Sequence, residues 1–224
     1  MCGRLVQATA MQKIAGMMQI LGQLELVPRY NITPSAPLAV IRSGPKGYEW
    51  ALPRWGLVPH WAKEIATGYK MINAKAETVA SKPAYRGPLR YRRCIIPADG
   101  FYEWRLEAKQ KQPYFIRAPD EQPLLLAGLW DYWHQGEQEL ETCTIITTSA
   151  NPQMLTVHDR MPVVLDPSDV AAWLDLDIQK PDLLEPLLQP TAHALTIYPV
   201  SKRVNKPVND DAECTVPLAA GSAS

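Results

Sequence analysis

Proline is the residue that most restricts what this chain can fold into. The 224 residues include 21 prolines, against 12 glycines and 2 phenylalanines. Proline interrupts helices, and in sheets it is confined to edges and bulges. A helix bundle is therefore excluded. The apolar fraction of 46% is that of a folded protein and excludes a disordered chain.

Short runs of β-type residues, bounded by proline, glycine or asparagine, dominate the pattern. They predict strands over 3–7, 37–41, 48–52, 94–97, 114–117, 124–130, 143–148, 162–165 and 193–200. Helical spacing predicts helices over 11–21, 168–174 and 183–188. We expect an α+β fold in one domain, residues 1–224: a twisted antiparallel, barrel-like sheet with peripheral helices and a frayed tail over 217–224.

The zero net charge conceals a division of the chain into a basic and an acidic half. Residues 1–118 carry 18 Lys and Arg against 7 Asp and Glu, whereas residues 119–224 carry 5 against 16. Such asymmetry favours contact with a polyanion such as nucleic acid, provided that the basic residues share one face.

The sequence predicts a cytoplasmic protein without metal, disulfide or cofactor. No apolar run is long enough to span a membrane, and no signal peptide precedes the first strand. The four cysteines lie far apart, and Cys94 and Cys143 stand in β-branched runs typical of a core. Motifs of dinucleotide enzymes, nucleotide triphosphatases, α/β-hydrolases and zinc peptidases are absent.

Four segments combine residues that a scaffold alone does not require. They are Trp55-Gly-Leu-Val-Pro-His-Trp61, Asn73-Ala-Lys-Ala-Glu-Thr78, Gly100-Phe-Tyr-Glu-Trp104 and Val157-His-Asp-Arg-Met-Pro162. Each also has a purely structural interpretation. Paired tryptophans are common in cores, and alternation along a strand would turn Glu103 outward. Asn73 would cap a helix or turn, and His158 would be a hydrogen-bonded structural histidine.

Together with Cys2-Gly-Arg4, Arg29-Tyr-Asn-Ile-Thr-Pro34, Arg93-Cys94 and Gly128-Leu-Trp130, these segments occur in an order that resembles one family. It is the SOS-response-associated peptidase (SRAP) family, whose members process abasic sites in single-stranded DNA. The resemblance extends from about residue 2 to residue 208. It implies that Met1 is removed and that Cys2 bonds covalently to the abasic sugar, with Asn73, Glu103 and His158 around it.

The chemistry of an abasic site explains why an N-terminal cysteine would be needed. In its ring-opened form the site is an aldehyde. The α-amine can add to it and lose water, and the thiol can then close a five-membered thiazolidine ring. Because an internal cysteine has no free amine, the resemblance and the chemistry both select Cys2. Glu103 and His158 would move protons, and Asn73 would orient the amine or the sugar.

DNA would be held by the basic half of the chain. Arg4, Lys75 and Arg86, with Arg90, Arg92 and Arg93 nearby, are candidate phosphate contacts, although some are expected to be ordinary surface charges. The family commonly has arginine where this chain has Lys75, which would weaken a bidentate grip. Trp61 could stack on bases together with Pro34, whose alternative interpretation is a plain turn proline.

Two other functions remain open at this level. The first is a thiol hydrolase or autopeptidase with Cys2 as nucleophile, or with Cys94 and His158. The second is a module that binds single-stranded DNA without chemistry. Covalent capture of abasic sites is the function we predict, with abasic single-stranded DNA as partner and with neither a membrane nor a nucleotide cofactor.

Overall fold

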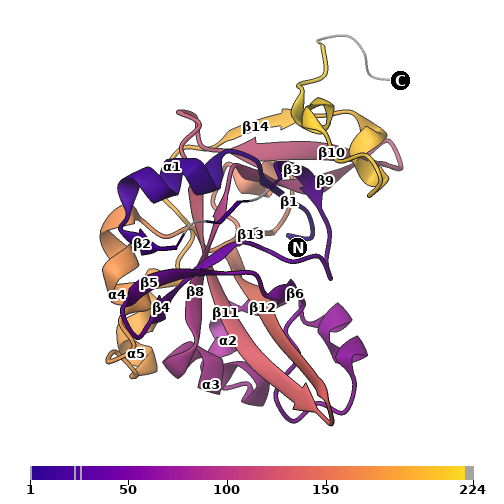
Figure 1. Ribbon diagram of the computed structural model, residues 1–224. Coiled ribbons are helices and arrows are strands. Elements are labelled where there is room, and N and C mark those ends of the chain that lie inside the picture. Colours follow the sequence, from indigo (N-terminus) through magenta and orange to yellow (C-terminus); the bar gives the residue numbers. More distant parts are fainter. Residues whose placement is uncertain (1, 23, 26, 220–224) are drawn as a thin grey trace.

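Two β-sheets form the centre of the molecule in the computed structural model, which describes residues 2–22, 24–25 and 27–219 (Figure 1). The first sheet has the order β14-β10-β9-β1-β3. Its strands are β1 (Leu5–Gln7), β3 (Arg29–Ile32), β9 (Gly100–Glu107), β10 (Gln110–Arg117) and β14 (Thr196–Pro199). All its pairings are antiparallel.

The second sheet has the order β13-β12-β11-β8-β4-β5-β2. Its strands are β2 (Ile20–Leu21), β4 (Val40–Gly44), β5 (Gly47–Ala51), β8 (Arg93–Ala98), β11 (Leu124–Gln135), β12 (Gln138–Ser149) and β13 (Arg160–Pro162), with β6 (Arg54–Trp55) and β7 (Asn73–Lys75) beside β12. The pairings of β6 and β7 with β12, and of β2 with β5, are parallel.

The predicted α+β class is confirmed, but the sheets do not close into a barrel. Sheets can hide their edges by means other than closure. In the first sheet, the last part of the chain covers the edge strand β3. The Asp210 carboxylate there accepts the backbone N–H groups of Tyr30 and Asn31. A covered edge needs no partner strand, so nothing drives this sheet to close.

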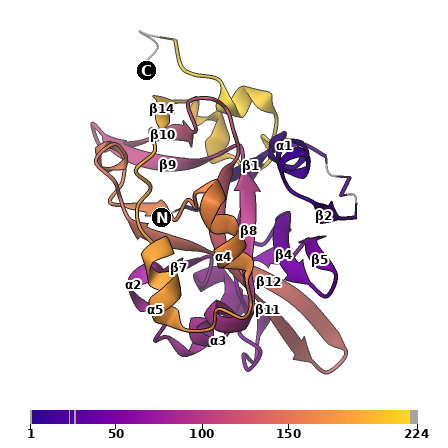
Figure 2. The ribbon, with the colours of Figure 1, turned by 90° about the vertical axis from the view of Figure 1, so that its left-hand side faces the viewer.

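Short helices lie around the sheets (Figures 1 and 2). They are α1 (Ala10–Met17), α2 (Ala76–Val79), α3 (Pro83–Tyr91), α4 (Val170–Leu174) and α5 (Pro181–Leu184), with 3₁₀ turns η1 (Ile65–Lys70), η2 (Met154–Thr156), η3 (Pro167–Asp169), η4 (Glu185–Leu187), η5 (Lys202–Asn205) and η6 (Ala212–Thr215). No described helix has the length and apolarity that crossing a bilayer requires.

Two helix predictions differ from the structure. The helix expected over 11–21 ends at Met17, because Ile20 and Leu21 pair with β5 instead. Helix α3 was not predicted, since Gly87 and Pro88 lie within it. Its buried Tyr85 and Leu89 pack into a core cluster of the second sheet, which offsets the poor local propensity.

The sheets share a core, and the first described residues of the chain lie between them. Cys2 and Leu5 belong to the same buried cluster as Ile116 of the first sheet and Ile145 of the second. Both views show the start of the chain between β9 and the β7–β12 region (Figures 1 and 2). Near the other end, Leu218 donates a backbone hydrogen bond to Pro199. The predicted frayed tail also includes residues 220–224, which lie outside the described residues.

Candidate functional site

Strand β1 places Cys2 beside Glu103. Leu5 of β1 pairs with Phe101 of β9, and Tyr102 donates its backbone N–H to Arg4. Because the two strands are antiparallel, residues before Leu5 lie alongside residues after Phe101. The segment from Cys2 to Arg4 is thereby brought next to Glu103, 101 positions later in the chain.

Cys2 lies in an environment that keeps its thiol protonated. Its side chain is fully buried, and Asn73 Nδ2 donates a 2.9 Å hydrogen bond to its carbonyl oxygen. Burial raises the pKa of the Cys2 thiol well above its usual value, and the negative charge of Glu103 raises it further. At neutral pH the sulfur is therefore a neutral thiol that needs a base in order to act as a nucleophile.

Asn73 has a second polar atom available near Cys2. Its Oδ1 is buried, and among the described residues no donor reaches it. Strand β7 fixes the side chain by pairing in parallel with β12, where Asn73 stands opposite Ile145. Asn73 does not cap helix α2, whose N-cap position is Lys75. Its amide is instead directed at the start of the chain.

His158 is oriented by its own loop. Its backbone N–H donates to Met154 of η2, and its Nδ1 accepts the backbone N–H of Arg160 at 3.0 Å. That bond assigns the proton of the neutral ring to Nε2. The Asp159 carboxylate lies 2.9 Å from the same Nδ1, so it can accept a proton only from the charged imidazolium.

A surface hollow of about 500 Å³ brings three of the predicted residues together. Its lining residues are Arg4, Glu103, Trp104, Lys111, His158 and Asn205. Glu103 is only 3% exposed, so the outward orientation expected from alternation is wrong. Cys2 and Asn73 are not among the lining residues; Cys2 is fully buried beside Glu103, and the half-buried Asn73 reaches Cys2 through its amide.

Trp104, Lys111 and Asn205 were not predicted as site residues. Trp104 lies in the aromatic segment around Glu103, so its motif was a usable indication. Lys111 reaches the hollow through the β9–β10 hairpin, and Asn205 through the 3₁₀ turn η5. Neither residue stands in a recognisable motif.

Trp61 and Arg86 meet on a second hollow, of about 420 Å³, which Arg90 and Tyr91 of α3 also line. The Trp61 side chain is 50% exposed, whereas Trp55 is buried in the core, so the two indoles have different environments. The side chains of Arg86 and Arg90 make no hydrogen bond or ion pair within the described part of the chain. This hollow offers an exposed ring beside two available positive charges.

Two other predicted DNA contacts, Lys75 and Pro34, line neither hollow. Lys75 is exposed at the end of β7. Pro34 occupies the first central position of a β-turn in which Ala36 N–H donates to Thr33, with Ser35 at φ 73°. This geometry provides the structural explanation for the proline.

Arg93 is wrong as a candidate phosphate contact. It is fully buried and donates to backbone carbonyls of Leu89, Trp173 and Asp175. Burial lowers its pKa to about 10. Arg92 forms an ion pair with the buried Asp131 at 3.1 Å, which compensates its charge.

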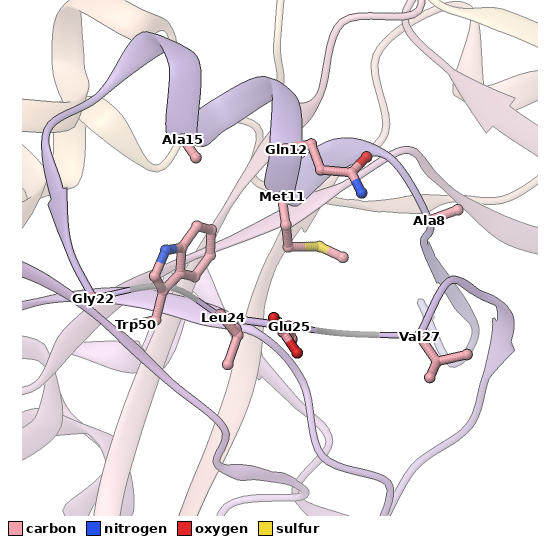
Figure 3. A pocket seen from close by; sticks show the side chains of 9 residues that line it. All are labelled: Ala8, Met11, Gln12, Ala15, Gly22, Leu24, Glu25, Val27 and Trp50. Carbon is pink, nitrogen blue, oxygen red and sulfur yellow. The ribbon is translucent and has the colours of Figure 1, made fainter.

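A further hollow, of about 670 Å³, lies beside helix α1 (Figure 3). Met11 and Trp50 face it, and of its described lining residues only Glu25 is ionisable. It therefore lacks the acid–base residues that catalysis requires. Within residues 2–22, 24–25 and 27–219, no three His, Cys, Asp or Glu side chains are grouped as a metal site.

The chain is similar to proteins of one known family over most of its length. Residues 1–207 match the family model of the SOS response associated peptidase (SRAP). The abasic site processing protein YoaM of Bacillus subtilis is 46% identical over 221 residues, covering 95% of this chain and 96% of that protein. The abasic site processing protein HMCES of Gallus gallus is 37% identical, covering 75% and 57%.

Solved structures show the same fold. A crystal structure of a protein from Bacteroides thetaiotaomicron superposes with a TM-score of 0.86 at 26% identity, covering 97% of this chain and 100% of that one. A phage-related protein of Bordetella bronchiseptica superposes with a TM-score of 0.72 at 30% identity, covering 90% and 95%.

Proposed function

The chain belongs to the SOS response associated peptidase (SRAP) family, whose curated relatives are abasic site processing proteins, and on that premise we propose that it captures abasic sites in single-stranded DNA covalently through Cys2. Removal of Met1 turns the Cys2 nitrogen into a free α-amine. The observation that supports the proposal most is the placement of Cys2 against both Asn73 and Glu103. A cytoplasmic location would give the protein access to chromosomal DNA.

The reaction starts at the amine. The neutral α-amine of Cys2 adds to the aldehyde carbon of the opened sugar to give a carbinolamine, which loses one water to form a Schiff base. The thiol sulfur then bonds to the same carbon, and its proton passes to the nitrogen. The product is a thiazolidine whose mass is that of protein plus DNA less one water.

Glu103 is suited to proton transfer in these steps. The thiol of Cys2 is protonated at neutral pH because burial and the Glu103 charge raise its pKa. A carboxylate beside it can take the S–H proton as sulfur attacks and return it to the nitrogen. Removing that base slows ring closure most, while addition of the amine continues.

His158 and Asn73 handle the sugar. His158 lines the hollow, and its imidazolium form can transfer a proton to the ring oxygen as the sugar opens, which leaves the neutral imidazole. The buried Oδ1 of Asn73 is an acceptor for the amine or a sugar hydroxyl. His158 and Asn73 together favour opening of the sugar next to the Cys2 nucleophile.

DNA binding follows from positive charge and exposed rings. Arg4 and Lys111 line the hollow at Glu103, and Arg86 lies with Trp61 on the second hollow. Phosphate contacts and base stacking are indifferent to sequence, which suits a protein that must act wherever a base is lost. Lys75, exposed at the end of β7, would add a further phosphate contact, and Pro34 would lie against bases from its turn.

The test mixes Met1-processed protein with a single-stranded oligonucleotide that carries one abasic site. We expect a species stable to heat and detergent on a denaturing gel, with an intact mass equal to the sum less one water. Cys2→Ala should form none, whereas Cys214→Ala, a matched loss of a buried thiol in another core cluster, should react like the wild type.

Absence of the species, with Met1 removal and folding verified, would contradict covalent capture. Binding without an adduct would then support a non-covalent module. Cleavage of a short peptide placed ahead of Cys2, lost in Cys2→Ala, would instead support the autopeptidase function that the family name describes.

A further inference from the structure

Asn31 of β3 connects three parts of the chain through one buried amide. It is 1% exposed. Its Oδ1 accepts a 2.6 Å hydrogen bond from Arg4 Nη1. Its Nδ2 donates to the backbone carbonyls of Val204, Lys206 and Asn209 at 3.0, 3.2 and 2.7 Å. A single side chain therefore joins Arg4, near the start of the chain, to a segment that begins 200 residues later.

We define the 203–211 segment as the end-clamp. It lies against the first sheet in the last coloured part of the chain (Figure 1). Asp210 fixes it by accepting the N–H groups of Tyr30 and Asn31 at 2.5 and 2.7 Å and by pairing with Arg29. Within the segment, Asn209 donates to the Arg203 carbonyl. The hydrogen bonds of Asp210 and Asn209 thus hold the end-clamp in place without a contribution from Arg4.

The end-clamp and Asn31 orient Arg4 without neutralising it. Besides Asn31, Arg4 donates through Nη1 to Val204 O at 2.5 Å and through Nη2 to Asn205 O at 3.3 Å. All three acceptors are uncharged. A carboxylate in the same place would cancel the positive charge, whereas carbonyl oxygens fix the side chain and leave the charge available.

The hydrogen bonds also leave one edge of the guanidinium open. Arginine has five N–H donors, of which three are used within the described residues. The two that remain are Nε–H and one N–H of Nη2. They form the edge that binds two oxygens of one phosphate side by side. Arg4 lines the hollow that holds Glu103 and His158.

The neighbouring Trp104 belongs to the same arrangement. Its Nε1 donates to Asn205 Oδ1 at 2.8 Å, and the Arg4 guanidinium carbon lies 5.8 Å from its ring centre. The end-clamp therefore contacts both a cation and an aromatic ring of the hollow. Its displacement would disturb both.

We propose that Asn31 is a positioning residue for DNA binding: it ties Arg4 to the end-clamp so that the open guanidinium edge meets a backbone phosphate next to the abasic sugar. The identity of the anion as a DNA phosphate rests on the proposed function. Arranging Arg4 beforehand removes the entropy cost of ordering a long side chain when DNA binds.

The experiment measures binding to an intact single-stranded oligonucleotide, without an abasic site, as a function of salt. Fluorescence anisotropy gives the slope of log affinity against log salt for wild type, Arg4→Gln, Asn31→Asp and Asn31→Ala, and for the double variant Arg4→Gln/Asn31→Ala. Arg4→Gln should lower the magnitude of the slope by about 0.7 and weaken binding about tenfold.

Asn31→Asp keeps the size of the side chain but places a carboxylate next to the Arg4 guanidinium. The magnitude of the slope of log affinity against log salt should therefore fall as it does in Arg4→Gln. Asn31→Ala should weaken binding because Arg4 loses one of its three acceptors and is held less rigidly, and the double variant should be no weaker than Arg4→Gln alone. If the aspartate does not fold, the alanine and double variants still give the comparison.

Asp99→Ala is the matched control. It removes a carboxylate that accepts the N–H groups of Ala8, Thr9 and Ala10 at the other end of β1, so it lowers stability without touching the hollow. Its salt slope should equal that of the wild type at equal folded fraction.

A wild-type slope in both Asn31 variants, with a reduced slope in Arg4→Gln, would overturn the inference. Additive losses in the double variant would do the same. Because the oligonucleotide is intact, these outcomes are independent of adduct formation. A failure of covalent capture would appear only in the separate assay with an abasic site.

Discussion

Replacing Gly100 with alanine tests whether the contact between β9 and β10 is as tight as the structure shows. Gly100 stands opposite Val6 of β1, three residues before Glu103. A Cβ there would lie 2.4 Å from Cζ of Phe115 and 2.5 Å from the carbonyl oxygen of Ile116. Non-bonded carbons settle at about 3.5–4.0 Å, so about 1 Å of separation is required.

The neighbours cannot supply that movement cheaply. The Phe115 ring packs against Tyr102 and Tyr198, with centroids 5.0 and 5.8 Å away, and the Ile116 oxygen is backbone. Overpacking costs about 1–3 kcal/mol, and a clash with both a held ring and backbone belongs at the upper end, about 3 kcal/mol. For a chain of this length the melting temperature should fall by about 6–12 °C.

Chemical and thermal denaturation of the purified variant measure this loss. Gly16→Ala is the matched control, because Gly16 lies in α1 with nothing within 4 Å of its added Cβ. It should gain about 0.5–1 kcal/mol from better helix propensity. A Gly100→Ala variant within about 0.5 kcal/mol of wild type would refute the packing argument. We also expect slower adduct formation, because β9 carries Glu103.

Three other results are expected. Three free thiols outside the proposed site are buried, so in the Cys2→Ala variant a thiol reagent such as Ellman's should react with none of them in the native protein within minutes and with all three after denaturation; fast native reaction would contradict the burial of the group Cys94, Cys143 and Cys214. Arg160 donates hydrogen bonds to Glu77 and lowers the pKa of that carboxyl in the folded protein. The stability that the pair contributes is therefore present above the pKa of Glu77 in the unfolded chain, and it is lost as pH falls through the lower pKa of the folded protein. Glu77→Gln should therefore lose about 0.5 kcal/mol at pH 7 by denaturant titration, and the difference should shrink as pH falls below the unfolded pKa of Glu and vanish below the lower folded pKa; a constant difference would exclude the ion pair as its cause. Trp61→Ala should weaken binding of intact single-stranded DNA about tenfold in the anisotropy assay while leaving the melting temperature unchanged; unchanged affinity would remove Trp61 from the DNA surface.

Most strands could be predicted because their pattern is local. The β-branched run at 94–97 lies within β8 (Arg93–Ala98), and the apolar run at 124–130 lies within β11 (Leu124–Gln135). The ends of the strands were less predictable. Strands β11 and β12 pair with each other as far as Gln135 and Gln138, and this pairing lengthens both strands into a long hairpin. Helix α3 contradicts local propensity and depends on packing of its buried face.

The composition of the candidate site followed from the motifs, whereas its geometry did not. The resemblance to the SRAP family, together with the chemistry of an amine beside a thiol, led to the prediction that Cys2 is the nucleophile after Met1 removal. Nothing local indicated that Glu103 is buried or that Arg93 donates to backbone carbonyls. Both depend on which strand covers which face.

The sequence by itself determined the α+β class, the absence of long helices and the residues with the right chemistry, because propensity, proline placement and motif order are properties of neighbouring residues. Only the tertiary structure decided that the sheets stay open, that Lys111 and Asn205 join Glu103 at one hollow, and that Asn31 links Arg4 to the end-clamp. Some of these contacts join residues far apart in the sequence, since Trp104 and Asn205 are separated by 101 positions and Asn31 and Asn209 by 178. They depend on strand register and on covered edges, which no short stretch of sequence encodes.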